Sequence, residues 1–293
     1  MVDGKNYLAL LDELKDIDFK LDYSLKSLNR YGTGGNAKIV VFPKDVKELA
    51  FVLKKVKGYY PYYVIGGGTN LLISDSGFDG VIISTLKVNS KTFKSNLLLV
   101  DSGERLSNVI EDMRYNCFGG LEFAIGIPAT VGGAVAMNAG CYGKTISEVV
   151  KYVVSDSGVY PCSECGFGYR TSRFLNGDTI LSVCFSLEPT EEDVIEERIK
   201  NYKAIRKNPK GKNCGSVFKN EGYFAGKVID EVGLKGYSIG GAKVSNEHAN
   251  FIIANNDCTS QNVYDLIKTI KEKVYHKKGI TLVEELVYLG DFK

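Results

Sequence analysis

The chain of 293 residues has little net charge, few histidines and no long apolar run. Its net charge is +2, and no basic stripe with interleaved aromatic residues is present, which argues against a nucleic-acid-binding surface. No uninterrupted apolar run approaches the ~20 residues that span a bilayer. The N-terminus is charged and amphipathic rather than a signal peptide. We therefore expect a cytoplasmic protein with no membrane insertion and no nucleic-acid partner.

The cysteines give no sign of a disulfide framework. They are seven in number and scattered, and an odd count cannot pair completely. Cys162 and Cys165 form a C-x-x-C pair, but no second pair follows at zinc-ribbon spacing, and His248 and His276 are the only histidines. We expect no metal and interpret the cysteines as reduced, buried thiols, with metal or redox use of the pair as the less favoured alternative.

The most informative segment is 126–143, GIPATVGGAVAMNAGCYG, with five glycines, four alanines and no charged residue. A main chain with such small side chains can lie against a large flat ligand. Free N–H groups beside Gly132 and Gly133 can also hold a phosphate. The alternative is a tight buried loop followed by a small-residue helix. Glycine loops at 32–35 and 66–70 could converge with this segment around an extended dinucleotide, with Thr69 and Asn70 hydrogen bonded to phosphate or ribose.

Hydrophobic periodicity predicts helices and strands along the whole chain. Helices are expected at 8–14, 44–57, 105–115, 191–206, 225–232 and 260–277, and strands at 38–42, 62–65, 81–84, 97–100, 149–154, 179–187, 251–254 and 282–289. The motif at 32–37 matches the G-x-G-x-x-G/A fingerprint but leads into a strand, so a Rossmann fold is excluded. A shift to charged residues at 188–193 predicts a boundary between a domain at 1–190, with subdomains at about 1–85 and 86–190, and one at 191–293.

Six motifs occur in a fixed order: 29–37 (NRYGTGGNA), 66–75 (GGGTNLLISD), 124–143, 167–174 (FGYRTSRF), 214–220 (CGSVFKN) and 239–251 (IGGAKVSNEHANF). This succession resembles the UDP-N-acetylenolpyruvoylglucosamine reductase (UDP-N-acetylmuramate dehydrogenase) family, in its shorter type without an extra substrate-covering loop. The resemblance runs from about residue 29 to residue 290. It implies an α+β protein with a vanillyl-alcohol-oxidase-type FAD-binding fold of two subdomains and an α+β substrate-binding C-terminal domain.

The resemblance also implies a reaction. NADPH reduces bound FAD, and the flavin passes hydride to C3 of the enolpyruvyl group of UDP-N-acetylglucosamine enolpyruvate, giving the lactyl ether, UDP-N-acetylmuramate. Negative charge then builds at C2 beside a carboxylate, so the site needs a cation and a proton donor. The implied protein is an oxidoreductase and flavoprotein of peptidoglycan synthesis, with roles in cell wall biogenesis, cell shape and cell division. Its partners are the UDP-sugar and NADPH, and we expect a monomer or weak oligomer.

By resemblance, three residues are catalytic: Arg170 binds the carboxylate or developing enolate, Ser216 donates the proton, and Glu285 is the C-terminal carboxylate. Glu284 is the adjacent candidate, and alternation along a strand sends the two to opposite faces. Lys207 and Asn220 match substrate-binding residues. The cofactor-binding residues implied are Gly66, Gly67, Gly68, Thr69, Asn70, Gly126, Ile127, Pro128, Thr130, Gly132, Gly133, Asn138 and Gly140.

The chain departs from the family pattern at Val287, where an arginine is usual, at Ala129, where glycine is common, and at Cys141, where alanine is usual. None of these changes removes a proposed catalytic group. Two other hypotheses stay open. An oxidase of the same flavin fold, acting on an alcohol or sugar, gives no role to Ser216 or Glu285. A nucleotide-sugar-binding protein that has lost catalysis is supported only by Val287.

Overall fold

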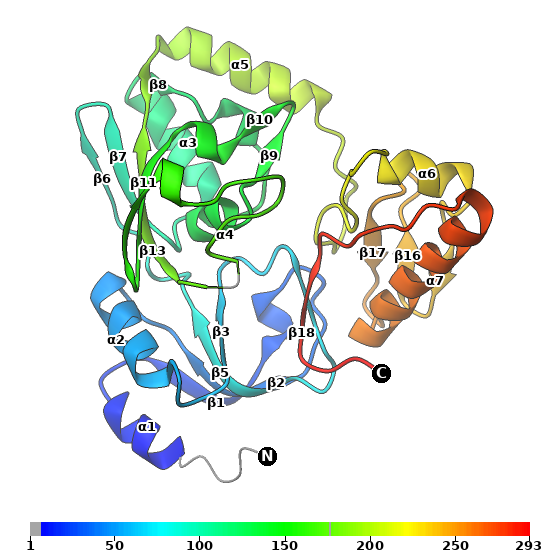
Figure 1. Cartoon of the computed structure of the whole chain (residues 1–293), viewed down its shortest axis with the longest axis horizontal. Coiled ribbons are helices and arrows are strands. Elements are labelled where there is room, and N and C mark those ends of the chain that lie inside the picture. Colours follow the sequence, from blue (N-terminus) through cyan, green and yellow to red (C-terminus); the bar gives the residue numbers. More distant parts are fainter. Residues whose placement is uncertain (1–6, 176) are drawn as a thin grey trace. The chain divides into compact units, whose positions relative to one another are not determined.

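The computed structural model describes residues 7–175 and 177–293 and forms two compact units (Figure 1). Among the described residues, unit 1 consists of the chain up to Lys20, Ile39–Gly67 and Gly80–Arg206. Unit 2 consists of Leu21–Lys38, Gly68–Asp79 and Lys207–Lys293. Two short N-terminal segments therefore pack with the C-terminal part of the chain. The division into functional domains at residue 190 stays a prediction.

The N-terminal part of the chain forms a four-stranded sheet. Its strand order is β1-β2-β5-β3, and β3 pairs parallel to β5 with Tyr62 opposite Val81. The helix α2 begins where the Asp45 side chain accepts a hydrogen bond from the Glu48 N–H, and its buried face carries Leu49, Val52, Leu53 and Val56. The elements are α1 (Tyr7–Glu13), β1 (Phe19–Ser24), β2 (Asn36–Val41), α2 (Val46–Val56), β3 (Tyr62–Ile65) and β5 (Phe78–Ser84).

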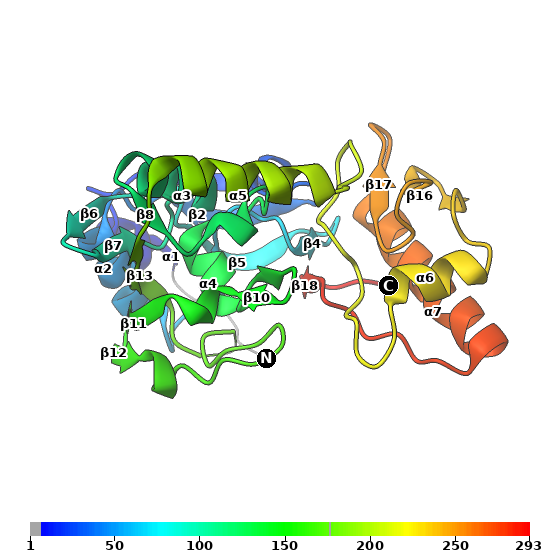
Figure 2. The same cartoon turned by 90° about the horizontal axis from the view of Figure 1, so that it is seen from above.

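The rest of unit 1 surrounds a five-stranded antiparallel sheet of order β12-β11-β13-β7-β6. Ile195 and Ile199 of α5 belong to its hydrophobic core, so this helix packs with the residues that precede it, beside α3 (Figure 2). The elements are β6 (Lys91–Lys94), β7 (Leu97–Asp101), α3 (Leu106–Tyr115), β8 (Phe118–Gly119), α4 (Val131–Ala136), β9 (Gly140–Cys141), β10 (Lys144–Thr145), β11 (Val150–Ser155), β12 (Gly158–Pro161), β13 (Ile180–Ser186), β14 (Glu188–Pro189) and α5 (Glu192–Ile205).

Unit 2 is organised around α7, the longest helix described. Thr259 closes its N-terminus with a capping box, and Gly279 ends it with a φ of 68°. The Asp75 carboxylate also accepts the N–H groups of Ser260 (3.0 Å) and Gln261 (2.9 Å), a favourable place for negative charge. The elements are β4 (Leu71–Ile73), α6 (Ala225–Glu231), β15 (Ser238–Ile239), β16 (Ala242–Val244), β17 (Ile252–Ala254), α7 (Ser260–Lys278) and β18 (Val287–Leu289).

All six predicted helices are confirmed, but the last predicted strand is largely wrong. Only Val287–Leu289 of the segment 282–289 forms a strand, which pairs parallel to β4. The preceding residues have one isolated bridge, between Glu284 and Phe218, rather than a continuous ladder. Strict strand alternation therefore does not decide between Glu284 and Glu285.

The cysteine prediction is borne out only in part. All seven cysteines are free thiols. Cys165, Cys184 and Cys214 are buried, whereas Cys117 is exposed and the others are partly exposed. Within residues 7–175 and 177–293, no group of three His, Cys, Asp or Glu side chains is placed to hold a metal, and no helix is long and apolar enough to cross a bilayer.

Candidate active site

The small-residue segment 126–143 is a loop that leads into the short helix α4. Thr130 caps this helix, its hydroxyl accepting the N–H of Gly133 at 3.3 Å. The N–H of Gly132 donates to the carbonyl of Ser102 at 2.8 Å. Both N–H groups that the sequence suggested for a phosphate are thus used within the protein.

The exposed part of this loop suits a large flat ring. Gly126, Pro128 and Gly133 are exposed, while Thr130 and Asn138 are buried. Small and apolar groups therefore make up the accessible surface, and the segment has no charged residue. A ring system such as the flavin of FAD can lie flat against such a main chain. The residues present fit the cofactor in this respect.

The second glycine loop meets the first at Gly66. A Cβ atom added to Gly66 would overlap the hydroxyl of Thr130, so the main chain of this loop lies against the cap of α4 within unit 1. Only glycine permits this approach. The structure therefore brings together the two loops to which the sequence assigned the cofactor. Gly67, Thr69, Ile127 and Gly140 are partly exposed in these loops.

Gly68 and Gly35, in the first two motifs, are explained by packing within unit 2. Gly68 has a φ of 58°, and a Cβ atom there would overlap the carbonyl oxygen of Leu28. A Cβ atom on Gly35 would overlap the carbonyl oxygen of Asp75. The Asn29 side chain closes the turn 29–33 by donating to Thr33 O at 2.8 Å. Close contact of main chains thus accounts for glycine at position 35, and positive φ values of 70° and 109° account for it at Gly32 and Gly34.

Arg170 lies on a loop that is fastened to the segment 126–143 by three hydrogen bonds. Arg170 Nη2 donates to Gly140 O (2.8 Å), Asn138 Nδ2 to Gly168 O (2.9 Å), and Ser172 Oγ to Ala136 O (2.7 Å). Arg170 also has a φ of 54°, a left-handed conformation that costs energy for a residue with a Cβ atom. The side chain of Asn138, predicted to bind cofactor, connects the two loops. Its position fixes the arginine beside the predicted flavin surface.

A second arginine, Arg206 at the end of α5, reaches the same segment. Its Nη2 donates to the sulfur of Cys141 at 3.1 Å, and its guanidinium lies 5.5 Å from the ring centre of Tyr142. A Cβ atom on Gly126 would lie 2.8 Å from Arg206 Cδ. Burial raises the pKa of the Cys141 thiol, and the charges of Arg206 and Arg170 oppose that rise. The family resemblance assigned substrate binding instead to the next residue, Lys207, which is exposed.

Ser216 and Glu285 lie on neighbouring segments of unit 2. The N–H of Glu285 donates to Val217 O at 2.8 Å, and the N–H of Lys219 donates to Val283 O at 2.8 Å. Both side chains belong to half-buried residues. The turn before Ser216 is closed by Asn213, whose Oδ1 accepts the N–H of Gly215 at 3.1 Å. The structure therefore brings together two of the three predicted catalytic residues within one unit.

The neighbouring candidate, Glu284, is held by α7. Its Oε1 lies 2.7 Å from Lys271 Nζ in a partly buried ion pair. That pairing gives Glu284 a structural partner. Asn220, predicted to bind substrate, uses its Oδ1 to accept the N–H of Ala225 at 2.9 Å.

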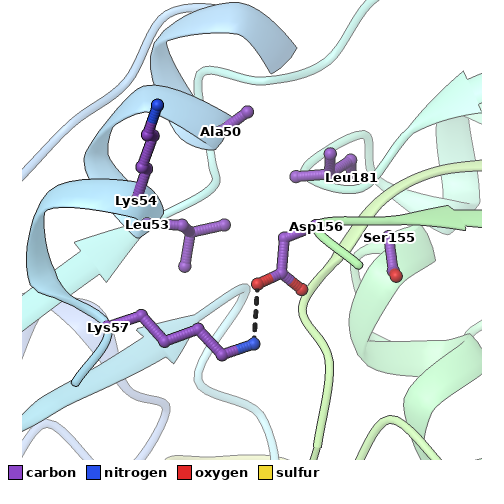
Figure 3. A pocket seen from close by; sticks show the side chains of 7 residues that line it. All are labelled: Ala50, Leu53, Lys54, Lys57, Ser155, Asp156 and Leu181. Atoms are coloured by element: carbon purple, nitrogen blue, oxygen red, sulfur yellow. Dashed lines mark hydrogen bonds and ion pairs between the residues drawn. The ribbon is translucent and has the colours of Figure 1, made fainter. Parts of the chain in front are cut away.

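A pocket of about 330 Å³ lies elsewhere on unit 1, between α2 and the strands β11 and β13 (Figure 3). Its lining combines aliphatic with polar and charged side chains, and it contains a hydrogen-bonded ion pair, Lys57 Nζ to Asp156 Oδ2 at 3.0 Å. It is lined by Ala50, Leu53, Lys54, Lys57, Ser155, Asp156 and Leu181. None of the predicted site residues is among them, so this pocket is separate from the proposed chemistry.

Comparison with known proteins gives this geometry a family. Residues 37–157 match the FAD-binding domain family, and residues 206–289 match the C-terminal domain family of UDP-N-acetylenolpyruvoylglucosamine reductase. The enzyme of that name from Clostridium kluyveri is 38% identical over 98% of both chains. Its Streptococcus pneumoniae counterpart is 37% identical, covering 97% of this chain and 98% of the relative.

A solved structure agrees with the sequence matches. The crystal structure of UDP-N-acetylenolpyruvylglucosamine reductase from Thermus caldophilus superimposes with a TM-score of 0.80 at 31% identity, covering 94% of this chain and 99% of that chain. The predicted α+β class and FAD-binding domain are confirmed. At this identity and coverage, the chain belongs to the UDP-N-acetylenolpyruvoylglucosamine reductase family.

Proposed function

We propose specific roles for Arg170, Ser216 and Glu285 in the reaction of this family. The chain is an FAD-containing oxidoreductase that reduces the enolpyruvyl group of UDP-N-acetylglucosamine enolpyruvate in peptidoglycan precursor synthesis. Bound FAD supplies the hydride chemistry, with NADPH as the reductant. The loops at 66–70 and 126–140 hold the flavin through their main chain and small side chains.

Arg170 binds the carboxylate next to the reacting carbon. Hydride arriving at C3 leaves negative charge on C2 and on the adjoining carboxylate, and a fixed cation stabilises that charge. The guanidinium Nη2 donates to Gly140 O, which holds the group beside segment 126–143, and a guanidinium is the side-chain group best matched to a carboxylate. The observation that carries this assignment is the three-bond connection between the Arg170 loop and segment 126–143.

Ser216 and Glu285 deliver the proton to C2. A serine hydroxyl is a weak acid, so it needs a neighbouring group to make proton donation fast. Glu285 lies on the segment hydrogen bonded to Val217, directly beside Ser216 in sequence. Its neighbour Glu284 has a structural partner in Lys271.

Lys207 and Asn220 complete the proposed substrate site. Lys207 is exposed, which suits a cation that meets a mobile anionic substrate, and Asn220 is exposed and carries a carboxamide, a group that hydrogen bonds to sugar and phosphate oxygens. We further propose a cytoplasmic monomer or weak oligomer that contributes to cell division and cell shape through wall synthesis. The oligomeric state is tested by the sedimentation coefficient of the purified protein, measured at micromolar and at higher protein concentrations.

Anaerobic single-turnover measurements on Ser216→Ala test the assignment. Reduction of the flavin by NADPH needs no proton at C2, so its rate should stay at the wild-type value. Reoxidation by the enolpyruvyl substrate should slow by about 10²–10⁴-fold, as for the loss of a general acid. Equal slowing of both half-reactions would assign Ser216 a structural role instead.

A further inference from the structure

The segment 68–71 is hydrogen bonded to both chain segments that carry the proposed proton donors. Asn70 Nδ2 donates to Glu285 O at 2.9 Å, and the N–H of Val287 donates to Asn70 O at 3.0 Å. On the other side, the Cys214 thiol donates to Leu71 O at 3.3 Å. Burial raises the pKa of this thiol to about 12, so it stays protonated and keeps its donor. Residues more than 140 positions apart in sequence are thus held together at main-chain atoms.

The main chain of Glu285 is held on both sides. Its N–H donates to Val217 O at 2.8 Å, and its carbonyl accepts the carboxamide of Asn70. Glu285 itself precedes the regular strand, because the ladder between β18 and β4 begins at Val287 opposite Leu71. No continuous ladder therefore sets the direction of the glutamate. The individual hydrogen bonds to its N–H and carbonyl groups hold the main chain of the glutamate instead.

We propose that Asn70 is a positioning residue for Glu285. Its carboxamide fixes the glutamate's main chain and so aims the carboxyl group toward the carbon that receives the proton. The proposal rests on the role assigned to Glu285 above. It adds to the sequence-based assignment of Asn70 as a cofactor residue, because the Asn70 carboxamide donates to the Glu285 carbonyl.

Asn70→Ala tests the proposal in anaerobic stopped-flow measurements. The rate of flavin reduction by NADPH should stay within about 2-fold of wild type, and reoxidation by the enolpyruvyl substrate should slow by about 10- to 100-fold, because a misplacement of about 1 Å is enough for such a loss. Both rates are measured with FAD in saturating excess, so that a weaker affinity of the 66–70 loop for the cofactor does not enter them. Equal slowing of both half-reactions would overturn the proposal and make Asn70 a cofactor ligand alone.

Tyr223→Phe is the matched control. Its hydroxyl donates to Thr281 O at 3.1 Å and accepts the N–H of Val283 at 3.4 Å, so the substitution removes two side-chain bonds to the same segment without touching Glu285. Reoxidation should stay within about 2-fold of wild type. If Tyr223→Phe slows reoxidation as much as Asn70→Ala, general loosening of the segment explains the effect and the specific role of Asn70 is refuted.

A double-mutant cycle separates this inference from the proposed function. On the Glu285→Gln background, Asn70→Ala should slow reoxidation by less than about 2-fold, since a residue acting through another shows strong non-additivity. Full additivity would overturn the positioning role. If Glu285→Gln alone reoxidises at the wild-type rate, the role of Glu285 fails. If Glu285→Gln is slow but Asn70→Ala is normal, only the inference about Asn70 fails.

Discussion

Replacing Gly66 by alanine places a methyl group against the hydroxyl of Thr130. Gly66 is not among the glycines with positive φ, so its backbone accommodates alanine and the contact with Thr130 is the source of strain. Thr130 cannot simply turn away, because its hydroxyl caps α4 through the Gly133 N–H. The two loops proposed to hold the flavin must therefore move apart.

The size of the effect follows from these contacts. Inserting a methyl group into such a close contact lowers the free energy of unfolding by about 1–3 kcal/mol. Thr130→Ala alone removes the helix cap and costs about 1 kcal/mol. The double variant Gly66→Ala/Thr130→Ala has no hydroxyl for the new methyl group to meet. Its cost should therefore be close to that of Thr130→Ala, well below the sum of the two single changes.

Urea unfolding and FAD titration of the apoprotein measure the two consequences. Gly66→Ala should both destabilise the protein and weaken FAD binding, and the double variant should recover most of both losses. Thr130→Ala serves as the reference for the lost cap. Additive losses in the double variant would refute the contact between the two loops. Unchanged FAD affinity in Gly66→Ala would contradict the assignment of these loops to the flavin.

Three further changes test other parts of the structure. Glu285→Gln should slow flavin reoxidation by about 10²–10⁴-fold. Glu284→Gln should leave the reoxidation rate within about 10-fold of wild type and lower the unfolding free energy by at most ~1 kcal/mol, because its ion pair is partly exposed. The reverse ranking of the two rates would move the catalytic role to Glu284. Gly68→Ala should lower the unfolding free energy by more than about 3 kcal/mol, because the strain of a positive φ adds to the overlap of the new methyl group with the main chain. Gly233→Ala, with a φ of 82° and open space around it, should lower it by only about 1–2 kcal/mol. Equal costs of the two substitutions would refute the overlap at Gly68. Burial lowers the pKa of His248 from 6.5, so the unfolded chain takes up the proton first, and the unfolding free energy should fall as pH drops below about 6.5. If the unfolding free energy of His248→Gln falls with pH as steeply as that of the wild type, His248 is not the source of the pH dependence.

The helices could be predicted from the sequence because their ends are set by nearby residues. The capping box at Thr259 and the left-handed Gly279 define α7 locally, and its prediction at 260–277 is confirmed as Ser260–Lys278. The strand β4 was not predicted, since Leu71–Ile73 is three residues long and pairs with a partner more than 200 positions away. Local pattern cannot identify such a partner.

The residues of the site could be predicted from the motifs, but their tertiary contacts could not. The sequence assigned the Gly132 and Gly133 N–H groups to a phosphate, but Ser102 and Thr130 accept them, and this depends on tertiary packing. Arg206 was missed for a similar reason. Nothing in an Arg-Lys pair indicates which side chain returns to the glycine loop, because only the packing of α5 decides it.

The most direct test of the account is an anaerobic titration of the purified yellow protein followed by its flavin absorbance. One equivalent of NADPH should bleach the flavin, and one equivalent of the enolpyruvyl UDP-sugar should restore the absorbance with formation of the lactyl ether. A reduced protein that is reoxidised by oxygen but not by the enolpyruvyl substrate would contradict the account and favour an oxidase of the same flavin fold.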